Sequence, residues 1–202
     1  LTSFHAHRSI LKMCAPMLAA ICGSNDSDGG MAAASITDVK PDIFRHALWY
    51  VYGGRIPDNE LKTHAKDIID AADKYSIVNL KLEAEAVYVE STKITIDNAI
   101  DNLHYADKKN CALLKEAVMN FLAENSTEAV EKISFSFDDV PAHFMKDLLV
   151  AFNRNNKKDA KGASVDDLTT LCVSDLRRKL YEMGLEVDGS REAMIASIKK
   201  NS

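Results

Sequence analysis

Cysteine is scarce in this sequence: the 202 residues include only four, Cys14, Cys22, Cys111 and Cys172. No two of them form a CxxC pair, so no disulfide framework is implied. Scattered single cysteines are typical of a reducing compartment. We therefore expect the protein in the nucleus and/or the cytoplasm.

Long apolar runs are also missing. No stretch approaches the roughly 18–20 apolar residues that a helix needs to cross a bilayer, and no signal peptide is visible. We therefore expect no membrane partner. Residue 1 is Leu and not Met, so we expect the chain to begin inside a longer protein.

Constellations of catalytic side chains are missing as well. Cys111 and His104 lack both an orienting acid and an oxyanion device. His5 and His7 share one face of an extended segment, but no further metal ligand is evident, so a structural role is favoured. We expect no enzymatic activity, no cofactor, no metal and no small-molecule substrate.

Charge is distributed unevenly along the chain. Residues 1–152 carry 15 basic and 22 acidic side chains, whereas residues 153–202 carry 10 basic and 8 acidic ones. An acidic body followed by a slightly basic tail indicates two modules with different partners.

The stretch 36–54, ITDVKPDIFRHALWYVYGG, is central to the first module. Residues 36–38 are expected to form a short strand, and Pro41 suits the first position of a helix. An apolar stripe at helical spacing, with glycines closing the helix, predicts that other elements pack on it. The stripe comprises Phe44, Ala47, Leu48 and Val51. These features alone fit a core helix in any α-rich domain.

Helical periodicity continues on both sides of this stretch. Residues 1–6 are expected to end a strand, a helix divided by Pro16 follows, and residues 23–35 read as a flexible loop. Thr95 is a good N-cap for one of the later helices. Further helices are expected at 61–75, 77–90, 96–106, 111–122 and 141–152.

Two segments of the helical region resemble each other. Residues 67–81, DIIDAADKYSIVNLK, match residues 101–115, DNLHYADKKNCALLK, at an offset of 34 positions. Two copies are fewer than the three or more that a solenoid needs. We therefore predict two helical hairpins with similar packing, in preference to a repeat array.

The first module resembles the BTB (POZ) domain. The resemblance lies in FHAHRSIL at 4–11, in residues 36–54, and in AADKYSIVNLK at 71–81. The module is most similar to the adaptor class that includes speckle-type POZ protein. The resemblance continues through residues 96–152, which match the helical extension (BACK/3-box-like) of such adaptors. Because the resemblance begins at the family's second strand, we expect the family's first strand and any helix before it to be absent from this chain.

This resemblance implies a homodimer and, in many members, docking of a cullin ubiquitin ligase scaffold. It places a dimer contact at Ile10, with Leu11 beside it as core. It places the cullin surface at Tyr52, which matches the Tyr of the family's Y-x-G turn, and at the preceding loop. There the family often carries an apolar-x-Glu motif; residues 24–35 contain no Glu, and Met31 supplies the apolar residue.

The tail resembles a SAP motif, a two-helix nucleic-acid-binding module. The matching positions are Leu171, Val173, Leu176, Arg177, Leu180, Gly184, Leu185, Gly189, Arg191 and Ile195. Helix N-termini offer N–H groups to phosphates, and basic side chains add charge. Those side chains are Arg177, Arg178, Lys179, Arg191, Lys199 and Lys200. The alternative is a small helical hairpin that packs on another protein.

The expected fold class is α+β, mostly α. A BTB/POZ domain without its first strand is expected at 1–90, a helical extension at 91–152, a linker at 153–163 and a SAP-like helix-turn-helix at 164–202. The expected function is a dimerising adaptor that recruits substrates to a cullin-RING ubiquitin ligase. The alternative is a chromatin- or nucleic-acid-associated BTB scaffold that is not coupled to ubiquitination.

Overall fold

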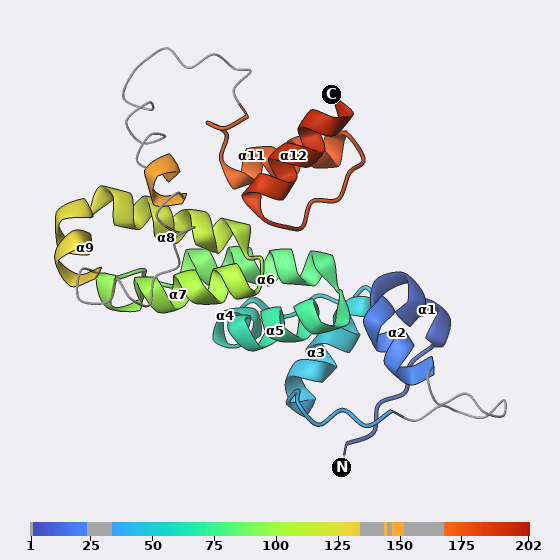
Figure 1. Cartoon of the computed structure of the whole chain (residues 1–202). Coiled ribbons are helices and arrows are strands. Elements are labelled where there is room, and N and C mark those ends of the chain that lie inside the picture. Colours follow the sequence, from blue (N-terminus) through green and yellow to red (C-terminus); the bar gives the residue numbers. More distant parts are fainter. Residues whose placement is uncertain (1, 24–33, 134–143, 145–146, 152–167) are drawn as a thin grey trace. The chain divides into compact units, whose positions relative to one another are not determined.

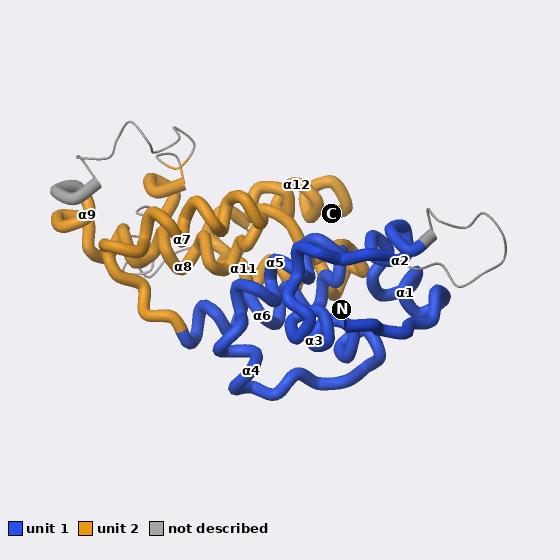
Figure 2. The backbone as a smooth tube through the Cα atoms, turned by 90° about the horizontal axis from the view of Figure 1, so that it is seen from below, with its two compact units in different colours: residues 1–91 blue, residues 92–202 orange. Residues whose placement is uncertain are grey.

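The computed structural model describes residues 2–23, 34–133, 144, 147–151 and 168–202 (Figure 1). The chain divides into two compact units, residues 1–91 and 92–202 (Figure 2). The helices of unit 1 are α1 (Arg8–Cys14), α2 (Pro16–Gly23), α3 (Pro41–Val51), α4 (Asp58–Thr63), α5 (Ala65–Tyr75) and α6 (Val78–Ser91). Those of unit 2 are α7 (Ile96–Lys108), α8 (Ala112–Glu124), α9 (Ser126–Ile133), α11 (Val173–Glu182) and α12 (Arg191–Asn201).

The predicted strands are not seen. Within the described ranges no residue belongs to a strand, and both 2–6 and 36–38 lie outside helices and ladders. A strand exists only when a second segment completes its hydrogen-bond ladder, and no described segment does so here. The α+β expectation is therefore confirmed only in its helical part.

Pro16 divides the first helical region, as predicted. α1 ends at Cys14, Ala15 leaves helical geometry with φ −147°, and Pro16 begins α2. Proline has no N–H to donate and its ring clashes with the preceding turn, so it starts a helix more readily than it continues one. The two helices pack on each other within unit 1.

α3 forms where the sequence predicts it, with Pro41 as its first residue. Its buried side chains are Ile43, Phe44, Ala47 and Val51, whereas Leu48 is only half-buried. The predicted stripe was therefore correct at three of four positions and missed Ile43. The ring of Phe44 lies edge-on to Phe4 and to Tyr75, with centroids 5.0 and 5.9 Å apart.

The helix predicted over 61–75 is broken into α4 and α5. The break is at His64, whose φ of −114° is not helical. The inward face nevertheless agrees with the prediction, because every apolar residue assigned to it is buried. These residues are Leu61, Ala65, Ile68, Ile69, Ala72 and Tyr75.

The two similar segments form two helical hairpins, α5–α6 and α7–α8. Each corner has one left-handed residue, Ser76 with φ 57° and Asn110 with φ 52°. The next amide then donates back to the helix, from Ile77 N to Ala72 O and from Cys111 N to Ala106 O, each 2.8 Å. The predicted likeness is thus a shared corner geometry.

The same corners also share an ion pair. Lys81 Nζ lies 3.0 Å from Asp73, and Lys115 Nζ lies 2.9 Å from Asp107. In each hairpin the lysine of the second helix reaches back over the corner to the aspartate eight positions earlier. Lys115 also pairs with Asp147 at 2.7 Å, which holds the helical residues 147–151 to unit 2.

The tail forms two helices within unit 2. α11 ends at Glu182, and Gly184 follows its cap; the φ of 68° at Gly184 lets Leu185 N donate to Leu180 O at 2.9 Å. The core of this pair contains Val173, Leu176, Leu180, Met194, Ile198 and, from α8, Ala112. The two predicted helices are therefore present and share their core with the extension. The predicted linker at 153–163 lies outside the described residues.

Candidate protein-interaction surfaces

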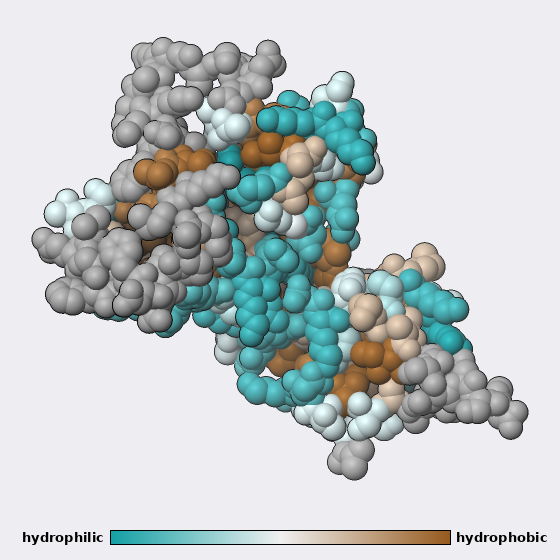
Figure 3. Space-filling view, in the orientation of Figure 1, coloured by the Kyte–Doolittle hydropathy of each residue, from teal (hydrophilic) through white to brown (hydrophobic). Residues whose placement is uncertain are grey.

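α1 and α2 expose an apolar surface on unit 1. The side chain of Met13 is 83% exposed and that of Met17 is 50% exposed. Ile10, the predicted dimer contact, is half-buried, whereas Leu11 is buried in the core, where the resemblance placed it. Figure 3 shows apolar surface in this region of unit 1. Such a patch is typical of an interaction surface.

Tyr52, the predicted cullin contact, closes α3. Its hydroxyl accepts from the backbone N–H of His7 at 2.6 Å and lies 2.8 Å from His7 Nδ1. Since the hydroxyl has one proton and accepts from the backbone, it can donate to Nδ1. The ring of Tyr52 is thus held at the start of α1 and is still 40% exposed.

Trp49 is a second exposed aromatic side chain that the sequence analysis did not single out. It is 59% exposed and its indole lies directly against Gly54, where any Cβ would collide with it. The sequence could have indicated this exposure, because Trp49 lies outside the apolar stripe of the amphipathic helix. Trp49 lies in the last turn of α3, three positions before Tyr52, which caps the helix.

Residues 34–40 are tied to α5 by two ion pairs. Lys74 binds Asp38, and Lys40 Nζ lies 2.8 Å from Asp67. The bond from Lys74 lowers the pKa of Asp38, and the same bond raises the pKa of Lys74. These contacts fix the described end of the loop before α3. Met31, the other predicted cullin contact, lies outside the described residues.

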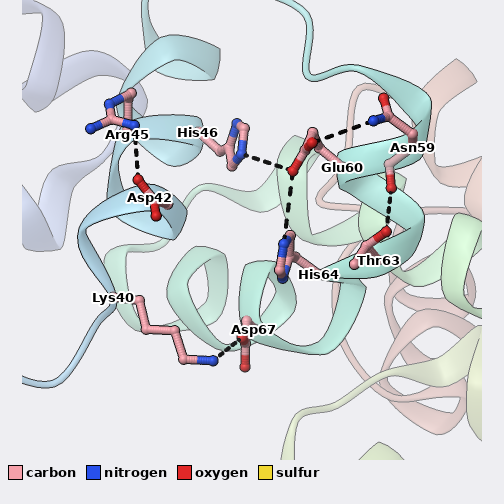
Figure 4. Close-up of polar contacts among 9 residues, drawn as sticks. All are labelled: Lys40, Asp42, Arg45, His46, Asn59, Glu60, Thr63, His64 and Asp67. Carbon is pink, nitrogen blue, oxygen red and sulfur yellow. Dashed lines mark hydrogen bonds and ion pairs between the residues drawn. The ribbon is translucent and has the colours of Figure 1, made fainter.

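Figure 4 shows a polar cluster between α3 and α4. Glu60 Oε2 lies 3.8 Å from Nε2 of His46 and 3.8 Å from Nε2 of His64. Asn59 Nδ2 donates to the other carboxylate oxygen of Glu60 at 3.3 Å.

His5 and His7 have no further metal ligands beside them. Among the residues that the structure describes, the His, Cys, Asp and Glu side chains form no group that could hold a metal ion.

The basic residues predicted to bind nucleic acid fall into different environments. Lys179, Lys199 and Lys200 are exposed. Arg178 is exposed but pairs with Asp175 at 2.7 Å, and Arg177 is half-buried. The structure therefore does not gather all six on one open surface.

Arg191, the sixth of these residues, has a structural role. Its guanidinium donates to the carbonyls of Thr169 and Leu171, at 2.8 and 2.7 Å. These bonds tie the start of α12 to the chain that enters α11. Arg191 is thus engaged within the protein in this structure.

Each tail helix has one amide near its N-terminus that is bound by a side chain of the protein. The N–H of Val173, the first residue of α11, donates to Glu116 Oε2 of α8 at 2.9 Å. At the start of α12, Ser190 Oγ accepts from Ala193 N at 3.3 Å. Burial, followed by a bond to Asp175, raises the pKa of the Cys172 thiol that precedes α11.

No helix in the described part of the chain has both the length and the apolarity to span a bilayer.

Comparison with known families identifies the class of the first module. Residues 2–92 match the family model of the BTB/POZ domain. This confirms the resemblance found in residues 4–11, 36–54 and 71–81. BTB domains commonly dimerise and bind partner proteins.

Three mouse proteins are similar to this chain over a longer range. TD and POZ domain-containing protein 1 and its 1-like relative are each 27% identical to it, and TD and POZ domain-containing protein 3 is 28% identical. Each similarity covers 128 residues, 63% of this chain and 34% of the Mus musculus protein. The chain thus spans about a third of the length of these relatives.

The similarity to these relatives extends beyond the BTB domain. The family match covers 91 residues, so at least 37 of the 128 matched positions lie outside it (128 − 91). The assignment to the speckle-type adaptor class and the SAP-like assignment of the tail remain predictions.

Proposed function

We propose that this chain is a dimerising protein-interaction adaptor that recruits substrates to a cullin-RING ubiquitin ligase. The observation that carries the proposal is the apolar surface of α1 and α2, with Met13 and Met17 exposed beside the half-buried Ile10, on a domain that matches BTB. In this proposal catalysis belongs to other subunits of the ligase.

The dimer is tested by placing a charge at its proposed centre. Ile10→Lys buries an ammonium group in an apolar interface, which is strongly unfavourable, so we expect monomers by light scattering. Ser9→Lys is the matched control, because Ser9 is an exposed neighbour on the same helix and should remain dimeric. A dimeric Ile10→Lys protein would remove this face from the interface.

The cullin surface is proposed at Tyr52, with Trp49 beside it. Both aromatic side chains are exposed, and tyrosine and tryptophan are enriched at binding hot spots. Calorimetry with a cullin N-terminal domain should show micromolar or tighter binding. Trp49→Ala and Tyr52→Ala should each weaken it.

Two controls separate contact from folding in this experiment. Tyr52→Phe removes the hydrogen bond to His7 but keeps the ring, so it should bind nearly as well as the unmodified chain. Tyr181→Ala removes an exposed tyrosine of unit 2 and should have no effect. If the unmodified chain shows no binding, ligase coupling is rejected, although the dimeric adaptor remains.

The alternative proposal is a BTB scaffold associated with chromatin or other nucleic acid. It is favoured by the exposed Lys179, Lys199 and Lys200 on the tail. Residues 164–202 carry six basic and seven acidic side chains, so binding to an AT-rich duplex should be modest and should weaken steeply with salt. Lys199→Glu with Lys200→Glu should abolish this binding.

A further inference from the structure

Unit 2 contains a pocket between its α7–α8 hairpin and its tail. The lining comes from this hairpin, from the helical residues 147–151 and from the first residues of α12. The centres of water molecules can move through about 50 Å³ of the pocket. That is room for about four water molecules, so the pocket is large enough for the end of one side chain and too small for a nucleotide-sized cofactor.

Part of the lining is apolar. It includes the side chains of Ala106, Cys111 and Met119, all of which are buried. Val150, which is half-buried, adds a further apolar side chain. A surface of this kind suits a chain of methylene groups, because contact with it removes apolar area from water.

The charged part of the lining is negative overall. Four carboxylates and two cations line the pocket: Asp107, Glu116, Asp147, Glu192, Lys115 and Arg191. Both cations are engaged within the protein, since Lys115 pairs with two aspartates and Arg191 donates to two backbone carbonyls. The excess of carboxylates therefore repels an anion and attracts a cation.

The same lining already holds one ammonium group of the protein itself. Lys115 Nζ lies 2.9 Å from Asp107 and 2.7 Å from Asp147, and it is 5.3 Å from the ring centroid of Phe144. Burial acts to lower the pKa of Lys115, but its hydrogen bonds to the two aspartates outweigh burial and raise that pKa. The lining thus stabilises positive charge even at a partly buried position. Glu192 is exposed, so its carboxylate is accessible to an incoming cation.

We propose that this pocket binds a lysine side chain of a partner protein, with the methylene groups against Ala106 and Met119 and the ammonium group paired with the lining carboxylates, Glu192 among them. A lysine combines an apolar stem with a charged end, which are the two halves that the lining complements. The proposal goes beyond the adaptor function above and does not depend on it. The lining belongs to unit 2, whereas the proposed dimer and cullin contacts are residues of unit 1.

The test uses three acetylated tripeptide amides with glycine at both ends and the full chain with methyl-labelled methionine. The central residue is lysine, norleucine, which has the same stem without the charge, or diaminopropionate, which has the charge on a shorter stem. The lysine peptide should shift the methyl resonance of Met119 and leave that of the exposed Met13 unchanged. With a millimolar dissociation constant, it should bind at least about fivefold more tightly than either control peptide, because each control lacks one half of the contact.

Three results of the peptide series would each overturn the proposal. An unshifted Met119 resonance would mean that the pocket takes no lysine. Equal binding of the diaminopropionate peptide would reduce the effect to attraction by surface charge, and equal binding of the norleucine peptide would reduce it to apolar contact.

Two variants of the full chain test the ionic half of the contact. Glu192→Gln removes a carboxylate of the lining, and Glu182→Gln removes an exposed carboxylate of α11 that lies outside the lining. Because both side chains are exposed, both variants should fold. Glu192→Gln should weaken binding of the lysine peptide by about two- to fivefold, and Glu182→Gln should leave it unchanged. Equal affinities of the two variants would also overturn the proposal, since the ammonium group would then not be paired with Glu192.

Discussion

At the scale of single residues, two of the described polar contacts join segments far apart in the sequence. His7 meets Tyr52 across 45 positions, and Glu116 meets Val173 across 57. No periodicity in the sequence indicates such pairs, because the packing of whole helices determines which polar groups come within hydrogen-bond distance. The resemblance to BTB adaptors singled out Tyr52, but its bond to His7 emerged only in the structure.

The bond between Tyr52 and His7 has a measurable effect on stability. Tyr52→Phe removes one partly exposed hydroxyl and leaves the His7 N–H without it, so the free energy of unfolding should fall by about 0.5–1.5 kcal/mol. Urea unfolding at pH 7 measures this. Tyr181→Phe, on an exposed tyrosine, should change stability by no more than about 0.5 kcal/mol; equal losses in both variants would contradict the assignment.

The pair of Lys74 with Asp38 makes a small contribution that depends on pH. The pKa of Asp38 is lowered from its ordinary 3.8, so its contribution is present above that pH and is lost as the pH falls through the lower, folded value. The pKa of Lys74 is raised from 10.5, so its contribution is present below 10.5 and is lost as the pH rises through the higher, folded value.

The contribution of Asp38 to stability can be tested by lowering the pH. Asp38→Asn should be slightly less stable than the unmodified chain at pH 7, and the gap should close as the pH falls below the ordinary value of 3.8. Urea unfolding from pH 7 to pH 3 measures it. A gap that stays constant over this range would show that the loss does not come from the charge of Asp38.

At the scale of elements, helix positions follow from local physical chemistry. Pro16 and Pro41 each begin a helix, and Thr95 N donates to Asn98 Oδ1 at 2.9 Å in a capping box. These signals depend only on residues within one turn, which is why the sequence predicted them. The break at His64 has no such signal, and the helix predicted over 61–75 was wrong there.

The two similar corners allow a matched experiment. Ser76 and Asn110 both have left-handed dihedrals, which cost little for asparagine and more for serine. Ser76→Gly should therefore raise the free energy of unfolding by about 0.5–1 kcal/mol, and Asn110→Gly should change it by only a few tenths. Thermal unfolding followed by circular dichroism compares the two; an equal gain at both corners would contradict the argument.

At the scale of the whole molecule, the chain forms two compact units, and their stabilities can be read separately. Trp49 is the only tryptophan in the sequence and lies in unit 1, so its fluorescence reports unit 1. Leu180→Ala removes a fully buried side chain from unit 2 and should cost about 2–5 kcal/mol there. The far-ultraviolet dichroism midpoint in urea should fall while the fluorescence midpoint stays.

The matched control for that experiment lies in unit 1. Ile69→Ala also removes a fully buried side chain and should lower the fluorescence midpoint. If Leu180→Ala lowers both midpoints equally, the two units unfold as one cooperative body and the separation into units has no thermodynamic counterpart.

The sequence by itself determined the helical character, most helix boundaries, the inward faces and the similarity of residues 2–92 to the BTB/POZ family model, because these depend on local periodicity and on a recognisable order of residues. It did not determine the absence of strand pairing in residues 2–6 and 36–38, since pairing depends on what lies beside a segment. Only the tertiary structure decided that Arg191 and the start of α11 are engaged internally. The reason is that Arg191 and Glu116 each bind a partner at least 20 positions away in the sequence, which only the packing of the chain brings within hydrogen-bond distance.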